Sequence, residues 1–81
     1  MIKLYVVKDK ASNTTNDPFH CLTDRDAVEG FKQVVNDEKT TICRHPEDFD
    51  LYYLGDYDPR SMDFSLIDTP KFLISASELK Q

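Results

Sequence analysis

Residues 44–58 read RHPEDFDLYYLGDYD, and this stretch decides the fold. Pro46 disfavours helical backbone at His45, so the stretch begins with an extended residue and a turn. The side chains that follow alternate with a period of two, which is typical of a strand. One face carries Phe49, Leu51 and Tyr53, and the other carries Asp50, Tyr52 and Leu54. Because both faces have apolar groups, we expect an interior strand, ended by Gly55, with a helix or a second copy packed on each side.

The size of the chain predicts one small domain covering residues 1–81. A chain this short buries only about 60% of its unfolded surface, so the core will be thin. Its free energy of unfolding should be about 4 to 12 kcal/mol. With 40% hydrophobic and 31% charged residues, the composition is that of a folded protein.

The main helix is predicted from Asp24 to Asn36. Thr23 has the position of an N-cap, with Asp26 three residues later as in a capping box, and Leu22 and Ala27 occupy the staple positions. Apolar residues recur at helical spacing at Ala27, Val28, Phe31, Val34 and Val35. Phe31 should be the main anchor. Close contact between helix and sheet is the expected reason for Gly30, and direct approach to a ligand is the alternative.

The other elements follow from alternation and turn residues. Strands are expected at Met1–Val7, at Pro18–Leu22 antiparallel to it, at Thr40–Arg44 with Ile42 inward, and at Lys71–Ser75. Lys8–Asp17 should be an exposed loop, with a plain hairpin connection favoured over a mobile binding loop. Asp58–Asp68 should be irregular, and Ser75–Gln81 a terminal turn or short helix. The predicted fold class is α+β: a small, mostly antiparallel sheet of about four to five strands with one main helix packed on it.

Residue types that carry catalysis or bind metals are present but lack the spacing of a known site. Two cysteines are scattered, and we expect free thiols; His20 and Cys21 would point apart on a strand, whereas Cys43 and His45 would share a face. The densest set of ligand types is His45, Glu47, Asp48, Asp50, Asp56 and Asp58. It has neither the glycine of a calcium loop nor the His and Cys number of a zinc site. We therefore expect no enzyme, no catalytic residue, no metal and no cofactor.

Charge and hydropathy limit the partners. No apolar run approaches the ~20 residues needed to cross a membrane, so we expect a cytosolic protein with no membrane partner. The net charge is −5, and the Lys and Arg residues are spread singly along the chain. Both features argue against strong non-specific binding to duplex DNA.

Aromatic residues interspersed with cations predict a surface that could hold unpaired bases. Core packing is the competing explanation for most of the aromatic residues in so small a domain. The candidate nucleic-acid-binding residues are Lys3, Tyr5, Lys8, Lys10, Arg44, Tyr52 and Arg60. The small core and the two-sided apolar strand also predict a homodimer.

A set of short motifs along most of the chain resembles the small nonstructural protein of gokushoviruses, the microvirus phages with single-stranded DNA genomes. The motifs are Val34-Val35-Asn36-Asp37, His45-Pro46-Glu47-Asp48-Phe49, Leu51-Tyr52, Leu54-Gly55, Tyr57-Asp58 and Phe72-Leu73-Ile74-Ser75-Ala76-Ser77. The amino-terminal Lys-Leu-Tyr strand, Pro18-Phe19 and the Asp-Ala-Val start of the helix also match.

The resemblance implies a non-capsid accessory protein in the host cytoplasm, often labelled DNA-binding and thought to act in genome replication or single-strand synthesis and packaging. Its partners would be single-stranded DNA or phage or host replication proteins. The alternative is an adaptor that binds a host or phage protein by its sheet edge or acidic turns without touching nucleic acid.

Overall fold

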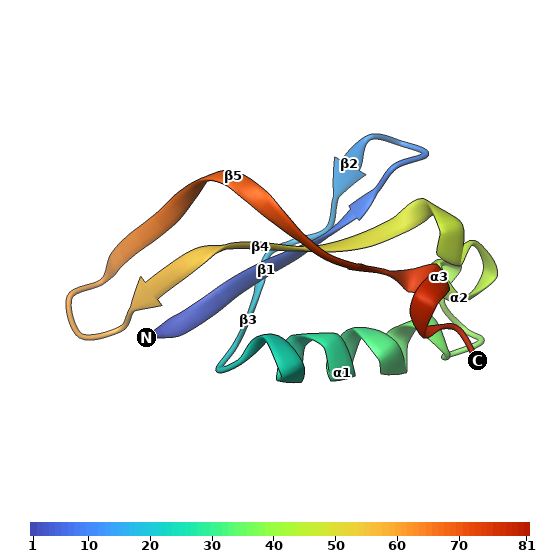
Figure 1. Ribbon diagram of the computed structural model, residues 1–81, viewed down its shortest axis with the longest axis horizontal. Coiled ribbons are helices and arrows are strands. Elements are labelled where there is room, and N and C mark those ends of the chain that lie inside the picture. The colour runs from blue at the N-terminus through green and yellow to red at the C-terminus, as the bar shows by residue number, and fades with distance from the viewer.

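The computed structural model describes residues 1–81 and consists of a sheet with one long helix on one face (Figure 1). In chain order the elements are β1 (Ile2–Asp9), β2 (Thr14–Thr15), β3 (Phe19–Cys21), α1 (Asp24–Val35), α2 (Thr41–Arg44), the 3₁₀ turn η1 (Pro46–Asp48), β4 (Phe49–Asp58), β5 (Asp63–Ser75) and α3 (Ala76–Leu79). All strand pairs are antiparallel in one five-stranded sheet. The predicted α+β class is confirmed.

β1 and β4 form the middle of the sheet. The strand order is β2-β1-β4-β5. On the same edge of β1, β2 pairs with Lys8 and Asp9, whereas β3 pairs with Lys3–Tyr5. The β1–β4 ladder runs from Ile2 opposite Tyr57 to Asp9 opposite Phe49. The strand predicted around Leu51 is therefore confirmed as an interior strand, and α1 covers one of its faces (Figure 1). The predicted pairing of the Pro18 segment with the first strand is confirmed as β3.

The core lies between α1 and the face of the sheet that β1 and β4 turn toward it. It contains Tyr5, Val7, Ala27, Phe31, Val35, Phe49, Leu51 and Ala76. Only 12 of the 81 residues are buried, so the core is as thin as the length predicted. The C-terminal turn completes this core, because Asn36 at the end of α1 donates its side-chain N–H to the carbonyl of Leu79 in α3 at 3.0 Å.

The helix cap is confirmed, whereas the hydrophobic staple is wrong. The Thr23 hydroxyl accepts from the Asp26 backbone N–H at 3.1 Å, and Asp24 and Asp26 lie at the positive end of the helix. Leu22 is 70% exposed, because the chain turns away between β3 and α1 and leaves the side chain in solvent.

Gly30 does not mark close helix-to-sheet contact, so that prediction is wrong. A Cβ at this position would meet nothing within 4 Å, and the residue is exposed. The space beside it is an apolar cavity of about 300 Å³ that Phe31 and Cys21 also line.

The segment Thr40–Arg44, predicted as a strand, forms the helical turn α2 instead. The Thr40 side chain explains the difference: its Oγ1 accepts from the Cys43 N–H at 3.1 Å and donates toward the carbonyls of Val34 and Asp37, both at 2.9 Å. These side-chain hydrogen bonds stabilise the helical turn relative to an extended backbone. Cys43 is buried in this turn rather than paired with His45 on a strand face.

The prediction that Gly55 ends the central strand is also wrong, because β4 continues to Asp58. Gly55 has a φ of 147°, a conformation that side chains with a Cβ rarely adopt. A Cβ there would collide with the backbone of Ser65 and would lie 2.7 Å from the Cα of Leu66. Glycine therefore allows the backbone of β5 to lie in close contact with β4 at this position.

The segment 58–68, predicted to be irregular, forms the turn and first half of a long hairpin. Asp58 closes the turn, since its carbonyl accepts from the Met62 N–H at 2.8 Å and its Oδ1 accepts from the Arg60 N–H at 2.9 Å. β5 then runs to Ser75, so the strand predicted at 71–75 is only its second half. Pro70 is tolerated because β5 lies at the sheet edge.

Candidate nucleic-acid interface

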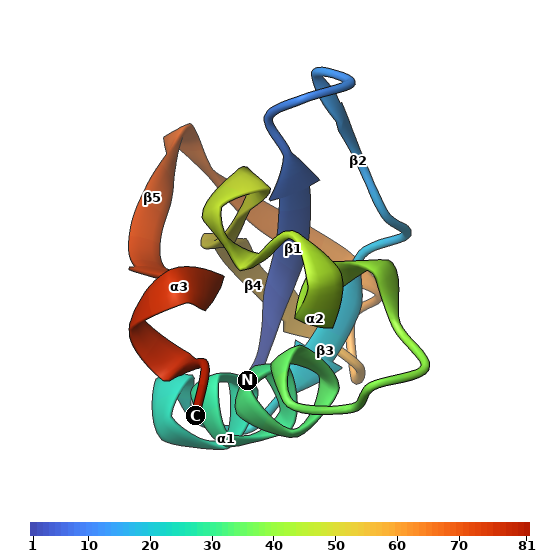
Figure 2. The same ribbon diagram turned by 90° about the vertical axis from the view of Figure 1, so that its right-hand side faces the viewer.

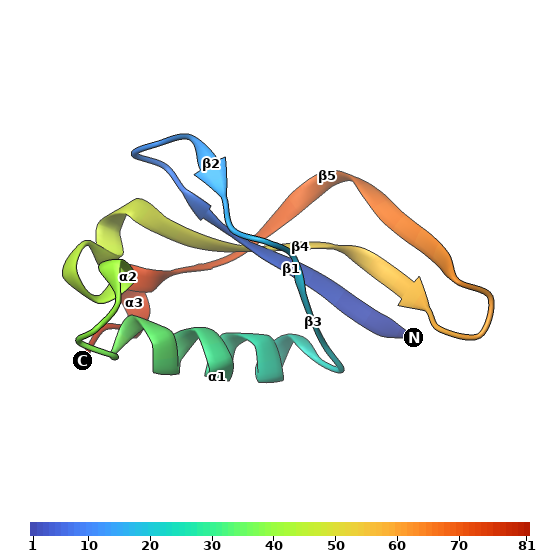
Figure 3. The same cartoon turned by 180° about the vertical axis from the view of Figure 1, so that it is seen from behind.

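The face of the sheet opposite α1 forms a saddle. Gly55 pairs with Leu66 and Tyr53 pairs with Lys71, so Leu54 alone on β4 faces four residues of β5, Ile67–Pro70. These four residues arch away from β4. Figures 1 and 3 show the arch of β5 and the β1–β2 hairpin rising on the side of the sheet away from α1, and Figure 2 shows β1 between them.

A groove of about 410 Å³ lies in this saddle, and we call it the saddle groove. Val6 and Tyr52 form its floor from the two central strands, and Lys8 lies at the end of β1. Its walls are Asn13 and Thr15 of the β1–β2 hairpin and Thr69 and Pro70 of the arch. The volume falls in the range that small-molecule sites occupy.

The aromatic side chain in the groove is held by a second ring. Tyr52 and Phe72 lie opposite each other on β4 and β5, with ring centroids 5.9 Å apart and planes at 76°. Such an edge-to-face pair fixes ring orientation. Tyr52 is half-buried and Phe72 is 49% exposed, so the pair offers aromatic surface on the open side of the sheet.

Two lysines predicted for the site lie in or near the groove, and they differ in their partners. Lys8 forms no ion pair, whereas Lys10 Nζ lies 3.4 Å from Asp50 Oδ2. Asp50 is opposite Lys8 in the β1–β4 register. Its side chain is 8% exposed, and its Oδ1 has no hydrogen-bond partner. Asp50 therefore neutralises Lys10 beside the groove. Lys8 remains as the free cation that lines the groove.

Lys3 and Tyr5 lie on the other face of the sheet. The prediction is wrong for Tyr5, because its ring is fully buried and has no surface to offer a base. Its hydroxyl donates to Asp24 Oδ1 at 2.6 Å. Lys3 Nζ is 3.8 Å from the same carboxylate oxygen and 5.4 Å from the centre of the Tyr53 ring. These residues tie β1 to the start of α1.

Arg44 and Arg60 lie at opposite ends of the long axis, in α2 and in the β4–β5 turn (Figure 1). The seven predicted residues are therefore not one surface: Lys8 and Tyr52 meet in the saddle groove, with Lys10 beside it. The sequence did not predict the wall residues, because polar residues in loops form no recognisable binding motif. Only the folded hairpin and arch bring them to the groove: Asn13, Thr15, Thr69 and Pro70.

Two tyrosine hydroxyls have raised pKa values. Burial and the hydrogen bond to Asp24 raise the pKa of Tyr5, and the hydrogen bond to Asp56 at 2.8 Å, followed by burial, raises the pKa of Tyr53. The folded state therefore favours the neutral phenols. Their contribution to stability is complete below the ordinary tyrosine pKa of about 10 and is lost as the pH rises above it.

We expect the free energy of unfolding to fall by about 1 kcal/mol per pH unit above pH ~10 from Tyr5 alone. Urea melts between pH 8 and 11 measure this. Tyr5→Phe should lower stability at pH 8 by about 1 kcal/mol through the lost hydrogen bond and should flatten the alkaline slope. An equal slope in Tyr5→Phe would contradict the assignment.

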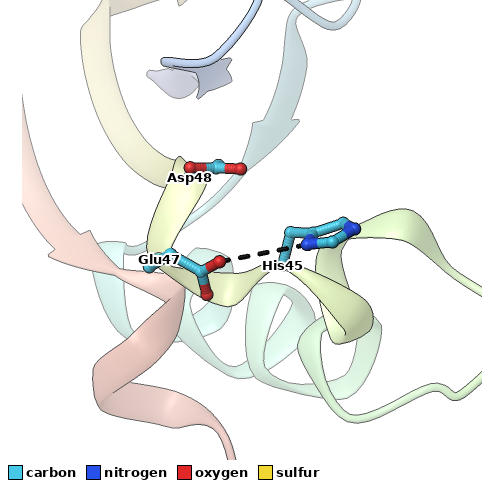
Figure 4. A group of neighbouring side chains, drawn as sticks. All are labelled: His45, Glu47 and Asp48. Atoms are coloured by element: carbon cyan, nitrogen blue, oxygen red, sulfur yellow. Dashed lines mark ion pairs between the residues drawn. The ribbon is translucent and has the colours of Figure 1, made fainter.

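Of the acidic and histidine side chains around residues 45–58, three come together. His45, Glu47 and Asp48 have ligand atoms within 4.8 Å of one another, and His45 Nδ1 lies 3.9 Å from Glu47 Oε1 (Figure 4). His45 and Glu47 are more than half exposed. Exposed groups of this kind are ordinary at a turn, so we assign no metal to them.

The two cysteines differ in their surroundings. Both are free. Burial raises the pKa of Cys21, which disfavours the reactive thiolate. Cys43 is buried, and its Sγ accepts from Lys80 Nζ at 3.3 Å.

The structure thus defines a small α+β protein that carries a helix on one face of its sheet and a groove lined by an aromatic ring and a free lysine on the other. Residues 2–79 match the family model described as Phage ORF5 protein, and the chain belongs to this phage protein family. No curated protein and no solved structure matches the chain. None of its helices has the length and apolar character needed to span a bilayer.

Proposed function

We propose that this phage protein is a non-enzymatic accessory protein that holds a segment of single-stranded DNA in the saddle groove. It would act beside the single-stranded genome of a gokushovirus-like microvirus, in replication or in single-strand synthesis and packaging. Membership of the phage family and the motifs around residues 45–58 support this setting. The observation that carries the proposal is the meeting of Tyr52 and unpaired Lys8 in one open groove.

The groove fits an unpaired strand better than a duplex. A base in single-stranded DNA has free faces, and stacking on an aromatic ring is worth about 1–3 kcal/mol per base. In a duplex those faces are stacked on neighbouring bases, and binding depends on many phosphate contacts. The chain has a net charge of −5 and one free lysine in the groove, so it lacks the cations for that mode.

The expected binding mode has one base on the Tyr52–Phe72 side and a neighbouring phosphate at Lys8. Asn13, Thr15 and Thr69 offer polar side chains along the walls, which suit base edges or sugar oxygens. Because few phosphates are contacted, the salt dependence should be shallow. With one to three contacts, the slope of log affinity against log salt is expected at about −0.7 to −2.

Fluorescence anisotropy of a labelled oligothymidine across salt concentrations tests the proposal. Tyr52→Ala and Lys8→Gln should each weaken binding by about 5- to 100-fold, and Lys8→Gln alone should flatten the salt slope. Asp50→Asn should strengthen binding several-fold, because it releases Lys10. Lys39→Gln, an exposed cation in the turn after α1, is the matched control and should bind as the unmodified protein does.

Two results would contradict the groove as the DNA site. Equal losses in Lys39→Gln and Lys8→Gln would mean that only total charge matters. Absence of binding at low salt would favour the adaptor function, in which the protein recognises a phage or host replication protein without nucleic acid.

A further inference from the structure

Half of the large apolar side chains that are exposed lie at one end of the molecule. Eight are exposed, and four of them lie before β1, in the β4–β5 turn or at the start of β5: Met1, Met62, Phe64 and Leu66. Figures 1 and 3 show the β4–β5 hairpin projecting past the start of α1, so the helix does not cover this end.

The strand register arranges part of this set on the sheet face away from α1. Tyr57 is opposite both Ile2 and Phe64, and Gly55 is opposite both Leu4 and Leu66. Tyr57 and Phe64 have ring centroids 4.8 Å apart. We call Ile2, Leu4, Tyr57, Met62, Phe64 and Leu66 the arm patch. Its two cross-strand rows contain no charged side chain.

Met62 has a backbone conformation that costs free energy. Its φ is 63°, which is unfavourable for a residue with an unbranched apolar side chain, and asparagine or glycine would relieve it. The side chain is also 76% exposed. The folded monomer gains no burial in return, which is expected where a side chain serves a contact outside its own chain.

We propose that two copies of the chain pack their arm patches against each other and form a two-fold symmetric homodimer. Within the arm patch, Met62, Phe64 and Leu66 alone expose on the order of 400 Å², about half of the ~800 Å² per partner that a standard stable interface buries, before Ile2, Leu4 and Tyr57 are added. The uncharged rows allow two copies with net charge −5 to meet without facing carboxylates. This places the dimer surface on the hairpin rather than over the centre of β4.

The dimer and the DNA site are independent in this arrangement. The arm patch uses the start of β1 and the tip of the hairpin, whereas the saddle groove uses the end of β1 and the arch of β5. Each protomer keeps an open groove. A dimer therefore presents two grooves to one strand, which raises its avidity for a long oligonucleotide but not for a short one.

Sedimentation equilibrium from 1 to 100 µM tests the proposal. The unmodified chain should be dimeric at low micromolar concentration, and Phe64→Thr with Leu66→Thr should weaken dimerisation at least 100-fold. Both positions are 65% exposed, so the monomer fold should survive, which circular dichroism checks. Leu22→Thr is the matched control: it removes an apolar side chain that is 70% exposed outside the patch, and it should leave the dimer unchanged.

Met62→Asn keeps the test decisive if the double variant fails to fold. It relieves the backbone conformation and removes the apolar side chain, so the monomer should be at least as stable while the dimer becomes about 10-fold weaker. A chain that is monomeric at 100 µM would overturn the proposal, as would a dimer equally sensitive to Leu22→Thr and to the arm-patch variants. Oligothymidine binding by the dissociated double variant reports on the saddle groove separately.

Discussion

Phe31→Ala is expected to lower the free energy of unfolding by about 3–5 kcal/mol. Phe31 is 3% exposed and belongs to the core between α1 and the sheet. It also borders the 300 Å³ cavity beside Gly30, so truncation enlarges an existing space that the surroundings do not fill. Against a total of about 4–12 kcal/mol for a chain of this length, most of the stability would be lost. Urea denaturation followed by circular dichroism measures the change.

Phe31→Leu and Val34→Ala separate this effect from a general sensitivity of α1. The leucine retains most of the volume and should cost about 1 kcal/mol. Val34 is 40% exposed on the same helix, so its truncation should cost less than 1 kcal/mol. A normal melting curve for Phe31→Ala would mean that the α1 face is not the core.

Gly55→Ala should destabilise the protein by about 2–4 kcal/mol. Two costs combine: the φ of 147° is unfavourable for alanine, and the new Cβ would meet the backbone of Ser65 and Leu66. Backbone atoms cannot move aside as the end of a flexible side chain can, so β5 must shift. Thermal and urea melts would measure the loss.

Gly30→Ala is the matched control, because it is the same chemical change with neither cost. Its Cβ meets nothing within 4 Å, and it lies inside a helix where alanine is favoured by about 0.5–1 kcal/mol. The two variants should therefore move stability in opposite directions. If Gly55→Ala were as stable as Gly30→Ala, the close approach of the β5 backbone to Gly55 would be wrong.

Elements specified by short-range chemistry were predictable from the sequence. The alternation around Leu51 gives an interior strand in any fold that buries it, and the Thr23 cap with apolar residues at helical spacing gives α1. One of the errors also has a local cause. Thr40 favours a helical turn through its side-chain cap, although its β-branched neighbours favour a strand.

The hairpin was missed because its determinants are tertiary. Glycine is depleted in strands, which is why Gly55 was predicted to end one, and only the close approach of the β5 backbone makes glycine necessary there. Phe64 and Leu66 looked irregular because the stretch Asp58–Asp68 is rich in turn residues and the partner strand lies across that turn.

The candidate site was predicted in part. Lys8 and Tyr52 were chosen as a cation and an aromatic residue, and the structure brings them together because Val6 and Tyr52 are opposite in the β1–β4 register. Tyr5 has the same side-chain chemistry but the opposite strand parity, which places it under α1. Composition cannot distinguish these two tyrosines, whereas strand register does.

The pairing of Ile2 with Tyr57 also bears on how the protein is made. During synthesis β1 can pair early with β2 and β3, but its partner on the other side, β4, emerges only after most of the chain has been made. Closure of so long a loop carries an entropy cost before any native contact repays it, which places folding among the slower small domains, on the order of milliseconds or longer. Until then the apolar side of α1 is open to chaperones and to other nascent chains.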